Sequence, residues 1–92
     1  MLYLECVVKR PSGLRETHVI AEVFDFFGRK EQVEVEEAFL ELRGGRAFLP
    51  VWGLHEDRDQ NLVEVELPLE SASGTNRIWV APNKLFTSGT PA

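Results

Sequence analysis

The chain has few of the side chains on which most disulfide, metal and nucleophilic sites depend. It contains one cysteine, Cys6, so a disulfide within the chain is excluded, and its two histidines are His18 and His55. No apolar run approaches the roughly 20 residues of a membrane-spanning helix, and the first ten residues lack the basic start and apolar run of an export signal. We therefore expect a cytoplasmic protein with no membrane partner.

Basic residues are outnumbered by acidic ones. The 92 residues include 10 Lys and Arg against 15 Asp and Glu, for a formal net charge of −5. Binding to DNA or RNA depends on Lys and Arg side chains that neutralise phosphates and release counterions. The composition therefore predicts no nucleic-acid partner, and it favours a cation or a basic protein instead.

Catalytic motifs are also missing from the sequence. No serine lies in a Gly-x-Ser-x-Gly setting, and His55-Glu56 lacks the second histidine, three residues after the glutamate, that a zinc-protease helix requires. Cys6 alternates with apolar residues that include Leu4 and Val8, a pattern typical of a buried cysteine without a catalytic role. We expect no enzymatic activity, no catalytic residue and no cofactor.

What the sequence does contain is alternation of apolar and charged residues. Val33 and Val35 alternate with Glu34 and Glu36, and a period of two places valines on one face of a β-strand and glutamates on the other. Similar alternation predicts strands near residues 2–9, 62–69 and 77–81. We expect the apolar rows to be buried and the glutamates to face water.

The stretch from Gln32 to Val51 is predicted to form three strands. Gly44 and Gly45 supply the positive φ angles of a tight hairpin turn between the second and third. One apolar row on each side of that turn is expected to share a buried face; the two rows are Ala38, Leu40 and Leu42, and Ala47, Leu49 and Val51. Pro50 lacks an N–H, which predicts an edge or a bulge there.

Residues 15–27 fit two templates. Alternation of Val19, Ala21 and Val23 predicts a strand, whereas a polar stripe with Gly28 as a stop predicts a helix. We favour the strand, because Val, Ile and Phe lose side-chain freedom in a helix.

The sequence as a whole predicts a mainly β protein, a small antiparallel barrel or sandwich of six to seven short strands; the alternative is an α+β fold with a helix at about 18–27. A barrel is preferred because it removes unpaired strand edges. We expect a single compact domain over residues 1–86, with 87–92 as a flexible C-terminal tail.

The polar run 55–61 is the one candidate for a metal site. Asp57, Asp59 and Asn61 stand at alternate positions, as oxygen ligands do at the start of a calcium-binding loop. The continuation does not match, because Leu62 replaces the required glycine and Pro68 the bidentate glutamate. We interpret the run as a solvated hairpin loop, with binding of a divalent cation or small ligand as the alternative function.

Four aromatic residues are candidates for an interaction surface: Phe26, Phe27, Trp52 and Trp79. Exposed together, they would form the kind of apolar patch that binds a partner; buried, they would close the ends of a barrel. Our first functional hypothesis is a non-enzymatic interaction or assembly module that binds a protein partner or a second copy of itself as a homodimer.

Overall fold

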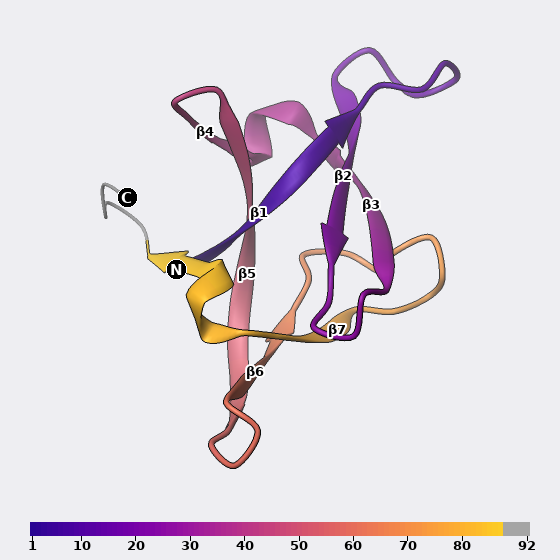
Figure 1. The fold of residues 1–92 in the computed structure, drawn as a ribbon. Helices are drawn as coiled ribbons and strands as arrows, with labels where there is room; N and C mark the ends of the chain where they lie inside the picture. The colour runs from indigo at the N-terminus through magenta and orange to yellow at the C-terminus, as the bar shows by residue number, and fades with distance from the viewer. Residues whose placement is uncertain (88–92) are drawn as a thin grey trace.

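The computed structural model describes residues 1–87 and folds them into one antiparallel sheet of eight strands that curls into a half-barrel (Figure 1). This confirms the mainly β prediction. Within residues 1–87, no helix is long and apolar enough to span a membrane. The elements, in chain order, are β1 (Leu2–Lys9), β2 (His18–Phe24), β3 (Lys30–Glu36), the 3-10 helix η1 (Glu37–Phe39), β4 (Glu41–Arg43), β5 (Arg46–Asp57), β6 (Leu62–Glu66), β7 (Arg77–Val80), the 3-10 helix η2 (Pro82–Lys84) and β8 (Leu85–Thr87).

Strand β1 organises the sheet, whose order is β3-β2-β1-β5-β6-β7 with β4 also paired to β5 and β8 to β1. One edge of β1 pairs with β5 over Leu2–Cys6. The other edge has two partners in succession, β8 along Leu2–Leu4 and β2 along Val7–Lys9. The sheet therefore divides along this edge of β1, as Figure 1 shows.

The ambiguous segment 15–27 contains strand β2, so the predicted alternative of a helix at about 18–27 is wrong. Seven consecutive pairs, from His18 opposite Glu36 to Phe24 opposite Lys30, join β2 to β3. The inward row of Val19, Ala21 and Val23 is completely buried. Burial of this row on a sheet outweighs the polar stripe that the helical template offered.

The strand expected over residues 38–43 is mostly absent. Residues 37–39 form η1, in which the Leu40 N–H donates to the Glu37 carbonyl, and β4 begins at Glu41. The Gly44-Gly45 turn is confirmed, with φ angles of 56° and 80°. Because the chain enters the short hairpin from a helical turn, Leu40 is buried but Leu42 is 63% exposed, and the predicted shared row is not formed.

Strand β5 is longer than predicted. His55–Asp57, expected in a loop, continue the strand and pair with β6, so the connecting turn is limited to 58–61. The ladder shifts register between Gly53 and His55, which marks a bulge. Pro50 pairs with β1 on one side and lies where the other edge of β5 changes partner from β4 to β6. Such a position tolerates a residue without an N–H.

The described chain does not end in the tail that was expected from residue 87. Instead, η2 leads into β8, which pairs with the first residues of β1. Thr87, the first residue of the expected tail, is the last residue of β8. The remainder of that prediction, residues 88–92, lies outside the described residues.

A single aliphatic core fills the concave side of the sheet, with Val19, Val33, Leu49, Val51 and Val65 fully buried. The loop 67–76 bridges β3 and β7, the strands at opposite ends of the sheet order, and the Ala72 N–H donates to the Gln32 carbonyl at 2.8 Å. The half-barrel is thus completed by loop contacts as well as by strand pairing.

Candidate functional site

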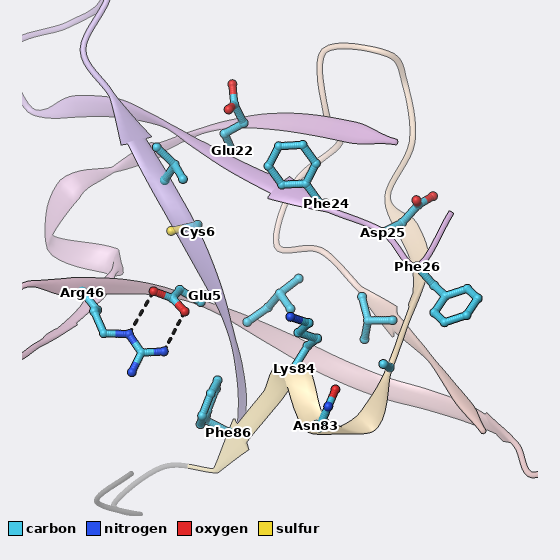
Figure 2. Close-up of a pocket in the computed structure, with 14 residues that line it drawn as sticks. Glu5, Cys6, Glu22, Phe24, Asp25, Phe26, Arg46, Asn83, Lys84 and Phe86 are labelled. Carbon is cyan, nitrogen blue, oxygen red and sulfur yellow. Dashed lines mark hydrogen bonds and ion pairs between the residues drawn. The ribbon is translucent and has the colours of Figure 1, made fainter. Parts of the chain in front are cut away.

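A cleft opens at the place where the sheet divides. The β1–β2 ladder ends at Val7 opposite Glu22, and the β1–β8 ladder ends at Leu4 opposite Leu85. Between these two points lies a space of about 710 Å³, bordered by β1, β2, the β2–β3 turn, η2 and β8 (Figure 2). The cleft is therefore a consequence of β1 changing partners along one edge.

Aromatic side chains dominate one side of this cleft. Phe24 and Phe26 line it, and Phe27 follows in the same turn; their exposed fractions are 52%, 55% and 63%. The Phe26 and Phe27 rings meet edge to face, with centroids 5.4 Å apart. The Phe26 and Phe27 rings therefore form one apolar surface, and the exposed Phe24 ring lines the same cleft.

Backbone hydrogen bonds fix the turn that carries these rings. The Asp25 N–H donates to the Arg29 carbonyl at 3.0 Å, and the Arg29 N–H donates to Asp25 Oδ1 at 2.8 Å. Gly28, with φ of 84°, supplies the left-handed conformation, and its N–H donates to the Asp25 carbonyl. The Phe26 N–H donates to the Trp79 carbonyl of β7 at 2.7 Å. The turn therefore holds its aromatic side chains in a defined position.

The opposite side of the cleft carries a bidentate ion pair. Arg46 Nε and Nη2 lie 2.9 and 2.7 Å from the two carboxylate oxygens of Glu5. This contact lowers the pKa of the Glu5 carboxyl below its ordinary value. The Arg46 guanidinium also lies 5.3 Å from the ring centroid of Phe48 and 5.8 Å from that of Phe86, within the range of cation–π attraction.

Five further side chains with polar or ionisable groups line the cleft: Cys6, Glu22, Asp25, Asn83 and Lys84. Glu22 is buried and accepts a hydrogen bond from Gln32 Nε2 at 2.9 Å. Cys6 is buried as predicted, and burial raises the pKa of its thiol to about 11, so the thiol is protonated at neutral pH. Lys84 projects from η2, and Figure 2 shows its side chain pointing into the cleft.

The four predicted interaction residues do not form one surface. Phe26 and Phe27 lie together, and the backbone of the half-buried Trp79 is bonded to Phe26. Trp52 is 42% exposed but lines a different hollow of about 460 Å³, where Leu69 is also exposed.

Sequence reasoning missed most residues of the cleft, among them Phe24, Lys84 and Phe86. The exposure of Phe24 was signalled by its place opposite the inward row of β2. Phe86 and Lys84 belong to η2 and β8, where no alternation marked a strand.

The three candidate metal ligands lie at the β5–β6 turn. Asp57 ends β5, and its Oδ1 accepts the Gln60 N–H at 3.1 Å; Asp59 and Asn61 follow in the turn itself. His55 Nδ1 lies 2.8 Å from Glu64 Oε1 across the strands. In the part of the chain that the structure describes, no group of three or more His, Cys, Asp or Glu side chains is placed to hold a metal ion.

Comparison of the chain with protein-family models, with curated proteins and with solved structures found no match. The chemistry of the cleft and of its aromatic turn is therefore the basis on which a function can be inferred.

Proposed function

We propose that the protein is a non-enzymatic interaction module that binds an apolar segment of a protein partner in the cleft between β1, β2 and β8. The observation that carries this proposal is that Phe24, at the end of β2, and Phe26 and Phe27, on the hydrogen-bonded turn that follows, are each more than half exposed at the cleft. Soluble domains rarely expose neighbouring large apolar side chains except where they bind a partner.

The energetics of burial favour this surface as a binding site. Fully burying a phenylalanine side chain is worth roughly 1.5–3 kcal/mol, so covering the exposed half of each ring contributes on the order of 1 kcal/mol. The bonds around Asp25 and Gly28 already order the turn in the free protein. A partner therefore loses little binding energy to ordering the loop on association.

The concave shape favours an inserted segment over a flat partner surface. A space of about 710 Å³ beside the Phe24 and Phe26 rings can receive apolar side chains from a short stretch of chain. We place the partner segment there, with the Phe27 ring contacting it at the margin.

A peptide selection tests the proposal. A random peptide library is panned on the wild-type protein, and enriched peptides are then measured against Phe26→Ser and Phe39→Ser. Phe39 is a matched control because it is 45% exposed on η1, outside the cleft lining. We expect the Phe26 variant to bind at least about tenfold more weakly, as for a central aromatic contact, and the Phe39 variant to bind like the wild type.

Three results would contradict the proposal. One is equal affinity of the wild type and the Phe26→Ser variant for the enriched peptides. Another is a wild-type dimer in light scattering that becomes a monomer in Phe26→Ser, because a second copy would then occupy the surface. The third is sedimentation with phosphatidylcholine vesicles that depends on Phe26, which would identify lipid as the ligand.

A further inference from the structure

Most charges around the cleft are already engaged within the protein. Glu5 is held by both nitrogens of the Arg46 fork. Glu22 is buried, accepts the Gln32 amide and lies 3.8 Å from Lys30 Nζ. Asp25 accepts a backbone N–H of its own turn. These carboxylates are therefore poor sites for a cation from a partner.

Lys84, by contrast, is a charged residue of the cleft that is not engaged in this way. It is exposed on η2 and lines the cleft, and among residues 1–87 its ammonium group has no ion-pair partner. It is near enough to Glu5 to add to the lowering of that carboxyl's pKa, after the larger contribution of Arg46. The Phe24, Phe26 and Phe86 rings line the same cleft. Two cations line the cleft, and Arg46 is already paired with Glu5, so Lys84 is the one left without an ion-pair partner among residues 1–87.

The overall charge of −5 does not set the charge preference of this cleft. Glu34 and Glu36 alternate with the buried valines of β3 and face outward, and Glu64 and Glu66 alternate with Val65 of β6. At physiological ionic strength the field of such exposed charges is largely screened beyond about 8 Å. Inside the cleft, Glu5, Glu22 and Asp25 already have partners within the protein, so Lys84 is the charge that remains for a bound group to pair with.

We infer that Lys84 determines specificity by pairing with an Asp or Glu side chain of the bound apolar segment. The inference rests on the proposed function, because it assigns the charge of the segment that the aromatic cleft receives. The partner sequence is then apolar with at least one acidic residue, not the basic sequence that net charge alone favours.

The same library provides the test when it is panned in parallel on the wild type, Lys84→Glu, Lys84→Met and Lys9→Glu. Lys9 is an exposed residue at the far end of β1, outside the cleft lining, so Lys9→Glu makes an identical charge change elsewhere. We expect Asp and Glu to be enriched in the peptides selected on the wild type and on Lys9→Glu. Peptides selected on Lys84→Glu should be enriched in Lys and Arg instead. Peptides selected on Lys84→Met should show neither enrichment.

A synthetic peptide and its Asp-to-Asn or Glu-to-Gln version give the magnitude. The neutral version should bind the wild type about two- to fivefold more weakly, the range for an ion pair that remains open to water. The two versions should bind Lys84→Met equally.

The outcomes separate this inference from the proposed function. Peptides of the same composition on the wild type and on Lys84→Glu, with binding that still depends on Phe26, would overturn the role of Lys84 and leave the interaction function standing. Failure to enrich any peptide whose binding depends on Phe26 would overturn both. Circular dichroism of each variant verifies that the exchange has left the fold intact.

Discussion

Glu31 occupies an inward position at the start of β3, on the same row as Val33 and Val35. Its side chain is 5% exposed, and Oε1 accepts hydrogen bonds from Ser71 Oγ and Ser73 Oγ, both at 2.7 Å. A buried carboxylate is tolerated only when such partners replace water. This single residue therefore attaches the loop 67–76 to the edge of the sheet.

Replacing this carboxylate tests its contribution. We expect Glu31→Ala to lower the free energy of unfolding by about 2 kcal/mol, because two hydroxyls lose a charged acceptor and the loop loses its attachment. Glu36→Ala, at an exposed position of the same strand, should change stability by less than about 0.5 kcal/mol. Urea unfolding followed by tryptophan fluorescence measures both, and equal midpoints for the two variants would show that Glu31 does not secure the loop.

The thiol of Cys6 provides a second prediction at this scale. Burial raises its pKa from the ordinary value of 9.0 to about 11. This difference reduces the thiolate fraction near pH 8 by about 100-fold. The folded protein should therefore react with Ellman's reagent at least about 100-fold more slowly than the urea-unfolded chain. Similar rates would indicate that the thiol is open to solvent.

The same shift has a consequence for stability. Because the pKa of Cys6 is higher in the folded state, the protonated thiol favours folding. This contribution is fully present below pH 9.0 and is lost as the pH rises through about 11.

At the scale of the element, β3 shows how alternation separates two environments. Val33 and Val35 are buried against the core, whereas Glu34 points outward and places Oε2 at 2.7 Å from His18 Nδ1 of β2. His55 of β5 makes a similar contact with Glu64 of β6, at 2.8 Å, although these two residues are directly opposite whereas His18 reaches Glu34 diagonally. The glutamate-rich strands therefore present cross-strand contacts on the outer face of the sheet.

Two substitutions on β3 distinguish its faces. Val35→Asp should destabilise the domain by more than about 3 kcal/mol, because it buries a carboxylate without a partner. Glu34→Lys should cost less than about 1 kcal/mol, since it removes an exposed contact. Thermal unfolding monitored by circular dichroism compares them, and similar midpoints would mean that the faces of β3 are reversed.

At the scale of the whole molecule, the cleft depends on the pairing of β1 with three strands. Its first residues pair with β8 and its last with β2 along one edge, while β5 covers the other. The aromatic turn and η2 come from distant parts of the sequence and meet at the space between β2 and β8. The proposed binding site is therefore a property of the sheet topology.

The distribution of carboxylates over the molecule predicts its response to divalent cations. Asp57 is engaged by the Gln60 N–H, and no metal-holding group of acidic side chains, histidine or cysteine is formed in residues 1–87. Calcium sites need six to eight oxygen ligands converging on the ion. Calorimetric titration with calcium or magnesium should give no saturable heat up to millimolar concentrations. A saturable one-to-one heat that is lost in Asp57→Asn would support the cation-binding alternative instead.

The candidate site was only partly accessible from the sequence. Phe26 and Phe27 were recognised as aromatic residues that flank a turn. Trp52 was grouped with them on residue type alone, and the structure places it in a separate hollow. Lys84 and Phe86 gave no signal, because β8 has three residues and forms by pairing with β1.

The sequence by itself determined the strands β1, β3, β6 and β7, because recurrence of apolar residues at every second position is a local property of each segment. For β2 it left a helix as the alternative, and pairing with β3 decided for the strand. Tertiary structure alone decided the helical turn η1, the extension of β5 through His55–Asp57, and the existence of β8, because each depends on a partner strand or a packing contact distant in sequence. It also decided the cleft, which exists because β2 and β8 share one edge of β1 and leave a space between them.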